Sequence, residues 1–477
     1  MLNVKNKKIT IVGLVLLVVL LLLTAFFVVY IGIAEKTSNE PDDSAIVGTF
    51  GEFSSYEPFQ EVPTMVGRNS KVGEVSDYGD KNYLADVNGT TLEEYYAYLD
   101  VLTDAGFKKH SDNGKEGMEG YVYTTAFTKS NLTLTVAHLV KFNKTYISVS
   151  EDLELSEHMI YKEEYVQNLN PNAKTTVHMM ELNSNGNSYI IQLKNGHFVV
   201  EDGGNIEDAP YFLDYIESLT PEGEKPVIEA WFISHAHIDH YGVLKEIATN
   251  PSYCERIYVE GVYFTRYNNQ TAQVYAGEDG LSESAWYITS SAKTFKTEKG
   301  ERTKLYRTQL GQKYYFCDIE IDVCFTLEQL QSNSSTDFND TSTWLMHYIE
   351  GQKFLHGGDG ARYSTMTMLT LYEQEYFDVD IFSVLHHGIN VYDYLTDYIS
   401  YETLLYNSIR KGSMFEPTSK YAWLEENAHM QEKAQETYTR GEGTVVMEFP
   451  YAVGTTKQLE PCDWRYNYGT PVRRVYE

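Results

Sequence analysis

Hydrophobic residues recur along this chain in patterns that predict three kinds of segment. Residues 9–34 form an uncharged, largely apolar run that is long enough to cross a bilayer. Residues 57–152 combine one helical repeat with short strand patterns, and residues 170–452 carry strand and helix patterns over a longer stretch. These patterns predict a transmembrane anchor, a small α+β domain and a larger α/β domain.

Three lysines within residues 1–8 precede the apolar run. Positive residues favour the cytoplasmic side, so we expect residues 1–8 inside the cell and everything after Glu35 outside. A cleaved signal peptide is the alternative, but the run is longer than a typical signal-peptide core. Residues 35–56 are mostly polar and contain Pro41, Gly48 and Gly51, which is typical of a linker.

The segment 57–152 predicts one helix followed by a strand meander. Thr91 and Glu94 have the spacing of a capping box, and Gly106 is placed to end the helix. Strands are expected at 121–127, 132–140 and 146–150. No catalytic cluster is found here, so a binding or spacer role is the expectation.

The segment 170–452 predicts a second, larger set of elements. Strands are expected at 176–182, 188–193, 197–200, 227–233, 257–264, 314–325, 342–349, 379–385 and 443–449, with a short one from Lys353. Helices are expected after a cap at Asp208, over 241–249 and over 365–375. Residues 265–310 are predicted to be an insertion over the site, and residues 453–477 an irregular tail.

Four potential metal ligands follow the strand 227–233, in the order His235, His237, Asp239 and His240. In an extended segment alternate side chains share a face, so the first two histidines point the same way. Nitrogen and oxygen ligands at this spacing suit one or two borderline metal ions such as zinc, with manganese as an alternative. A surface loop that happens to be rich in histidine is the competing interpretation.

Further carboxylates and histidines stand at the tips of other expected strands. Asp202 lies in Glu-Asp-Gly-Gly, Asp359 in Gly-Gly-Asp-Gly, and His386 and His387 precede Gly388. A single histidine at a strand end is usually structural. Because several strand ends carry such residues beside the cluster from His235 to His240, we favour one shared metal site over separate structural roles.

Strand ends that carry D-G-G, H-x-H-x-D-H, G-D and H-H-G in that order resemble the metallo-β-lactamase fold hydrolases. The resemblance covers about residues 170–452 and implies an αββα sandwich with the metal site at one edge. It implies that His235 and His237 hold a first metal ion, that Asp239, His240 and His387 hold a second, that Asp359 bridges them, and that Asp202 orients ligands from behind.

The same resemblance makes His386 the weaker ligand candidate of its pair and places it toward the substrate. Where many members carry a further histidine, this chain has Asn339-Asp340-Thr341-Ser342. The first site therefore lacks one protein ligand, which Asn339 or Asp340 is placed to supply directly or through water.

Residues 338–342, with the later G-D and H-H-G, look like a particular branch of this superfamily. That branch contains the metallohydrolase domain of competence DNA-uptake proteins and bacterial surface phosphocholine esterases. The resemblance implies hydrolysis of a phosphodiester-like bond by metal-bound hydroxide, because zinc lowers the pKa of bound water to about 7. Asp239 is placed to accept a proton as well.

The net charge of −30, from 38 Lys and Arg against 68 Asp and Glu, opposes a nucleic-acid groove. A small phosphoester or a surface polymer is the expected substrate. A lactone or β-lactam hydrolase and a non-catalytic binding protein are the alternatives.

The 40 tyrosines allow an aromatic site for a quaternary ammonium group, although packing is the commoner role of such residues. The four cysteines have no C-x-x-C spacing, so a zinc knuckle is not expected. Oligomeric state does not follow from the sequence.

Overall fold

A computed structural model describes residues 57–462, with gaps at 80, 152, 168, 266, 268–280, 330–336, 390–392 and 409–422. Within these described ranges, no helix combines the length and apolar character needed to cross a membrane. The expected anchor at 9–34 and the linker at 35–56 lie outside them.

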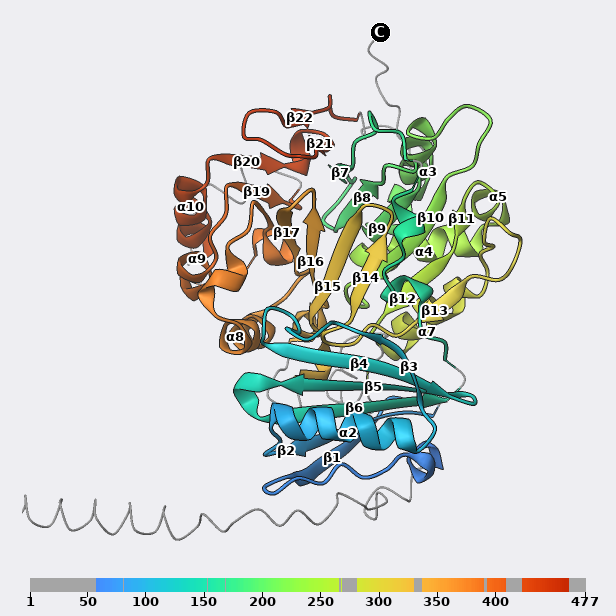
Figure 1. Ribbon diagram of the computed structural model, residues 1–477. Coiled ribbons are helices and arrows are strands. Elements are labelled where there is room, and N and C mark those ends of the chain that lie inside the picture. The colour runs from blue at the N-terminus through green and yellow to red at the C-terminus, as the bar shows by residue number, and fades with distance from the viewer. Residues whose placement is uncertain are drawn as a thin grey trace, which may run out of the picture. The chain divides into compact units, whose positions relative to one another are not determined.

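The N-terminal part of the described chain is an antiparallel sheet with one helix on it (Figure 1). Helix α2 (Leu92–Asp104) begins with the predicted capping box, and Gly106 follows its end with φ of +88°. Tyr95, Tyr98 and Leu102 of α2 are buried against the sheet. The strands, in the spatial order β1-β2-β6-β5-β4-β3, are β1 (Lys71–Asp77), β2 (Asn82–Asn88), β6 (Lys144–Glu151), β5 (Leu132–Leu139), β4 (Val122–Lys129) and β3 (Lys108–Asp112).

Three strands of this sheet, β1, β2 and β3, have no counterpart in the sequence prediction. For β3, Lys-Lys-His-Ser-Asp, the reason is its place at the sheet edge, where it has no buried side chain. An edge strand has one unpaired side and does not need an apolar pattern.

The second sheet carries the central strand of the site. It has the order β13-β12-β10-β9-β8-β7-β21-β22, with β11 beside β10. Its strands are β7 (Thr176–Met179), β8 (Ser188–Gln192), β9 (Phe198–Asp202), β10 (Val227–Ile233), β11 (Tyr258–Val259), β12 (Gly261–Phe264), β13 (Lys304–Tyr306), β21 (Val445–Glu448) and β22 (Lys457–Gln458). Strands β9, β10, β12 and β13 run parallel, so their carboxyl ends meet at one edge.

The third sheet has the order β14-β15-β16-β17-β18-β19-β20. Its strands are β14 (Lys313–Phe316), β15 (Ile319–Phe325), β16 (Trp344–Ile349), β17 (Gln352–His356), β18 (Ile381–Ser383), β19 (Thr403–Tyr406) and β20 (Glu436–Thr439). From β17 to β20 the pairs are parallel. The strands β19 and β20 were not predicted, and the expected single strand 314–325 is a hairpin of β14 and β15.

The second and third sheets pack face to face around a shared apolar core, to which Ile191 and Phe232 contribute from one sheet and Val323 and Phe354 from the other. Helices cover the outer faces (Figure 1). On the second sheet these are α3 (Ala209–Ser218), α4 (Ile238–Thr249), α5 (Pro251–Cys254) and α7 (Leu281–Ala292); on the third they are α8 (Arg362–Leu371), α9 (Asp393–Tyr398) and α10 (Trp423–Lys433). This mixed α/β arrangement is the expected sandwich.

Other sequence predictions need correction. Helix α4 begins at Ile238 rather than Tyr241, so Asp239 and His240 lie in its first turn. Asp208 stands at the N-cap position of α3 but makes no side-chain cap bond; its carboxylate instead accepts from the backbone of Asn183 and Asn205. In the described part of 265–310, the Tyr267 hydroxyl accepts from the backbone N–H of Ala236 beside the histidines, α7 packs on α4, and β13 extends the second sheet.

The N-terminal sheet contacts residues 307–311, the segment just before β14. Thr124 of β4 donates to the carbonyl of Leu310, and Asn113 donates to that of Gly311. A cation–π contact joins Arg307 to Tyr78, with the guanidinium 4.4 Å from the ring centroid. This contact region does not include the strand tips at which the candidate ligands lie.

Candidate metal centre

The carboxyl end of β10 delivers the histidine cluster. The strand ends at Ile233, residues 234–237 bend, and α4 starts with His237 at its N-cap position. The backbone N–H of His240 donates to the carbonyl of His237, which closes the first turn. Glycine at 242 is required by the packing of α4, because a Cβ there would lie 2.8 Å from the carbonyl oxygen of Gly204. This close approach brings His240 beside the tip of β9.

One group of potential ligands comprises Asp239, His240, Asp359 and His387, whose ligand atoms lie within 4.8 Å of one another. The carboxylate of Asp359 is 3.2 Å from His240 Nε2 and 3.1 Å from His387 Nε2. Asp239 approaches His387 Nε2 at 3.3 Å. The four residues come from three places in the chain: the first turn of α4, the end of β17 and the end of β18.

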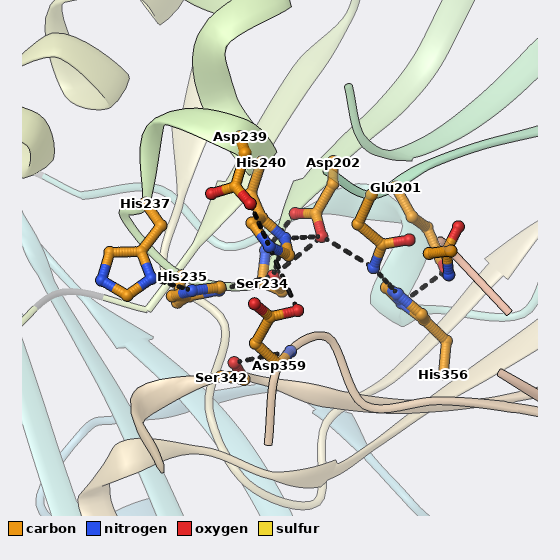
Figure 2. A network of polar contacts seen from close by, with 12 residues as sticks. Glu201, Asp202, Ser234, His235, His237, Asp239, His240, Ser342, His356 and Asp359 are labelled. Carbon is orange, nitrogen blue, oxygen red and sulfur yellow. Dashed lines mark hydrogen bonds and ion pairs between the residues drawn. The ribbon is translucent and has the colours of Figure 1, made fainter. Parts of the chain in front are cut away.

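A second group comprises His235, His237 and Asp359. His235 Nε2 and His237 Nδ1 are 2.9 Å apart, so the two rings converge as the alternation predicted. Figure 2 shows these two rings on one side of Asp359, with Asp239 and His240 above it. Asp359 belongs to both groups, which is the arrangement expected of a bridging ligand.

The atoms of the first group fit a metal ion. His240 Nε2, His387 Nε2 and Asp359 Oδ1 are buried and, apart from their close contacts with one another and with Asp239, have no hydrogen-bond partner among the described residues. Buried polar atoms without partners are rare in native structures. Imidazole nitrogen and carboxylate oxygen are ligands that zinc and related divalent ions accept. We conclude that the residues of this chain are suited to hold such an ion.

Asp202 holds the histidines in position from behind. Its Oδ2 is 2.7 Å from His240 Nδ1, and the Ser234 hydroxyl donates to the same oxygen at 2.8 Å. A carboxylate only accepts, so His240 carries a proton on Nδ1, and Nε2 is the nitrogen that faces Asp359 and His387 and could bind a metal ion. Orientation of a ligating histidine by such a carboxylate is a general feature of metal sites. The orienting role of Asp202 stays a prediction, and its contacts with His240 and Ser234 are the ones that such a role requires.

His386 and His387 both adopt left-handed backbone conformations, with φ of +50° and +56°. Asp202 does so as well, at +56°. Such conformations are unfavourable for residues with a Cβ and concentrate at functional sites. The turn aims the His387 ring inward, where Nδ1 contacts the carbonyl of Asn407 at 3.0 Å and Nε2 faces the ligand group.

His386 and Asn339 lie next to each other near Asp359, the residue that belongs to both ligand groups. Asn339 Nδ2 is 3.4 Å from His386 Nε2, which in turn is 3.9 Å from Asp359. Asp340 is fully buried, and one of its oxygens accepts from the backbone of Ser364 in the first turn of α8. Asn339 rather than Asp340 is therefore the residue of the 338–342 stretch that points to the site, and His386 occupies space beside it.

Opposite charges dominate the electrostatics of the ligand groups. Burial acts to lower the pKa of His387, but Asp359 and Asp239 raise it to about 9. Burial likewise opposes the shift at Asp359, yet His240 and His387 hold the pKa of its carboxyl well below the usual range. The pKa of His235 is lowered well below its ordinary value by burial and by the neighbouring His240 and His237. Without metal, the neighbouring carboxylates therefore keep His387 protonated at neutral pH. A bound metal cation would replace the proton on Nε2.

Several residues around the site were missed by the sequence prediction. Ser234 links Asp202 to His235, with its hydroxyl oxygen 3.1 Å from His235 Nδ1. Asn187, Glu201, His347 and His356 form a buried polar cluster that touches Asp202. Ser234 was detectable, since it directly precedes His235, whereas the cluster joins positions that no local pattern connects.

Two packed sheets with helices outside, and candidate ligands at strand tips along one edge, define a mixed α/β sandwich with a candidate metal centre. A family model described as the metallo-beta-lactamase superfamily matches residues 183–290. The chain therefore contains a metallo-β-lactamase superfamily domain. The matched range includes Asp202 and the cluster from His235 to His240.

Solved structures also resemble the chain. A Cronobacter sakazakii (Enterobacter sakazakii) metallo-β-lactamase with a HARLDQ motif aligns at 16 % identity with a TM-score of 0.27, covering 42 % of this chain and 66 % of that one. A mutant of it aligns at 17 % identity with a TM-score of 0.26, covering 42 % and 70 %. A metallo-β-lactamase from Hirschia baltica aligns at 14 % identity with a TM-score of 0.21, covering 50 % and 72 %. A comparison with curated proteins found no match to the chain.

Proposed function

We propose that this protein is a metal-dependent hydrolase of phosphodiester or phosphocholine-type ester bonds. The observation that carries the proposal is the convergence of two ligand groups on one buried carboxylate, that of Asp359. His235 and His237 would hold one ion, Asp239, His240 and His387 a second, and Asp359 would join them. Zinc is the metal we favour, with manganese as the alternative.

When bound, the metal ions supply Lewis-acid chemistry, which lowers the pKa of a coordinated water and neutralises charge on a phosphoester. The protein's own residues divide the remaining tasks. Asp202 keeps His240 in the required tautomer. Asp239 and His386 have side chains 25 % and 18 % exposed, against 4 % or less for Asp359, His387 and His240. Substrate can reach these two more easily than the other three, which supports Asp239 as a proton acceptor and His386 as a substrate contact.

Charge supports a small substrate over a nucleic acid. The chain carries a net charge of −30, and residues 232–244 around the ligands contain no Lys or Arg. A groove for a long polyanion needs a stripe of basic residues to neutralise successive phosphates. The likeness of residues 338–342 to phosphocholine esterases and competence-protein metallohydrolases supports the phosphodiester class as a whole.

We expect the purified chain to cleave small phosphodiesters faster than DNA. The assay compares bis-(nitrophenyl) phosphate, nitrophenyl-phosphocholine and single-stranded DNA at the same salt, with and without a chelator. Faster cleavage of DNA, with a steep loss of rate as salt rises, would contradict the charge argument. A lactone and a β-lactam in the same series test the alternative hydrolase, and absence of any turnover by the metal-loaded protein would favour the binding-protein alternative.

We further propose that residues 9–34 anchor the protein in the cell membrane with the hydrolase outside. The supporting observations are the uncharged apolar run and the lysines before it. Protease added to intact cells should then cut in the linker at 35–56 and release a soluble, active product. A hydrolase domain that stays protected until the cells are lysed would contradict this orientation.

A further inference from the structure

A second polar cluster lies behind the ligand groups, between the two packed sheets. Glu201 of β9, His347 of β16 and His356 of β17 are each at most 1 % exposed. The Glu201 carboxylate contacts His347 Nε2 through one oxygen and His356 Nδ1 through the other, the latter at 2.8 Å. His347 Nδ1 faces the carbonyl of Phe354. The cluster therefore joins strands of both sheets through one buried carboxylate.

This cluster is a support rather than a binding site of its own. A cavity of about 10 Å³ lies beside it, lined by Glu201, Ser234 and His356 among others. Space of that size holds no more than one water molecule. Any role of this cluster therefore rests on the contacts that its side chains make with other residues of the protein.

The hydrogen-bond partners of His356 fix its tautomer. His356 Nδ1 lies 2.8 Å from a Glu201 carboxylate oxygen, and a carboxylate has no proton to give, so this nitrogen carries the proton. His356 Nε2 is then an acceptor, and it lies 2.6 Å from Asn187 Nδ2. Only the amide N–H₂ of Asn187 can donate to this nitrogen, so the orientation of the Asn187 amide follows from the tautomer of His356.

Asn187 passes this orientation to the site. Its Nδ2 also donates to Asp202 Oδ2, at 3.3 Å. The same oxygen accepts from the Ser234 hydroxyl and His240 Nδ1. Figure 2 shows the contacts that run from His356 to Asp202 and on to His240. With the amide reversed, its carbonyl oxygen would face the Asp202 carboxylate and repel it.

We propose that Glu201, His356 and Asn187 are positioning residues that fix Asp202 and thereby prepare His240 and His235 to bind metal. This inference rests on the metal centre proposed above. Asp202 acts on His240 directly and on His235 through Ser234, so both ligand groups depend on it. Burial acts to raise the pKa of Glu201, but His347 and His356 lower it to about 2, consistent with a permanent acceptor.

The test is metal affinity in matched variants of the purified full-length chain. His356→Leu removes both the donor and the acceptor, whereas His356→Gln can donate to Glu201 and accept from Asn187. Asn187→Leu breaks the link at its other end and leaves the backbone bonds of Asn187 in place. Zinc dissociation constants come from competition with a chromophoric chelator, and thermal unfolding of the metal-free protein is measured in parallel.

We expect His356→Leu and Asn187→Leu to weaken zinc binding by about 10- to 100-fold, the range typical of residues that orient metal ligands. His356→Gln should recover most of this loss. The control is His178→Leu, another buried histidine, which contacts Tyr215 and Thr176 away from the site. It should lower the melting temperature and leave zinc affinity unchanged.

Two results would overturn the inference alone: unchanged zinc affinity in folded Asn187→Leu, or an equal loss in the His178→Leu control. If His356→Leu does not fold, Asn187→Leu and His356→Gln decide the matter by the same criteria. A wild-type chain that binds no zinc or manganese would instead overturn the proposed metal centre and this inference with it.

Discussion

Replacing Asp359 by alanine is expected to empty both metal sites and to reduce hydrolysis by about a thousandfold or more. The reason is that Asp359 is the one carboxylate shared by the two ligand groups. It lies 3.2 Å from His240 and 3.1 Å from His387, and its removal takes a buried carboxylate from both ligand groups. Elemental analysis of the purified chain should fall from more than one equivalent of metal to nearly none.

An isosteric pair separates this effect from general destabilisation. Asp359→Asn keeps the shape and removes the charge, and it should lose metal nearly as fully as the alanine variant. The matched control is Asp380→Asn, since Asp380 is also a carboxylate beside the third sheet, but it accepts from the backbone of Lys353 and from Gln352. If Asp359→Ala retains full metal and full activity, the bridging role is wrong.

The sandwich and its site edge could be predicted because their patterns are local. The run Val227–Ile233 is short and apolar except for Glu229, and the strand has the predicted bounds. The histidines directly after it needed no tertiary information to be placed together. Strand tips that end in Asp359 and in His386-His387 could be added because parallel strands direct their carboxyl ends to one edge.

Elements without such patterns were missed. Strand β20 has the sequence Glu-Thr-Tyr-Thr and is largely half-buried at the edge of its sheet. Its sequence therefore lacks the alternation of apolar and polar residues from which a strand is predicted. Helix α4 begins earlier than expected because His237 serves as its N-cap position without a capping side chain. Propensity near a helix start is weak, so a start without a capping side chain is difficult to place from sequence.

The support behind the ligands could not be predicted at all. Asn187 and His356 are 169 residues apart in the chain, and both look ordinary in their local sequence. Glu201 stands beside Asp202 in Glu-Asp-Gly-Gly, yet alternation in β9 sends its carboxylate toward the other sheet. Such pairs are defined only once two sheets face each other, which is why the ligands were accessible from sequence and their support was not.

The last prediction separates the two ligand groups. His240→Ala should deplete mainly the metal held by Asp239, His240 and His387, and reduce hydrolysis by about a hundredfold or more. His237→Ala should deplete mainly the ion held by His235 and His237. The physical reason is that each histidine belongs to one group only, whereas Asp359 belongs to both. Each variant should therefore retain about one equivalent of metal.

Metal content and cobalt absorption spectra of the two variants provide the measurement. The spectra should differ, because one remaining site has two carboxylates and the other has one. His110→Ala is the control: this histidine contacts the carbonyl of Ser156 and belongs to neither group, so metal content should not change. Loss of both ions from His240→Ala and from His237→Ala alike would contradict separate sites. It would indicate that the two ions bind cooperatively through Asp359, and that neither half of the centre forms without the other.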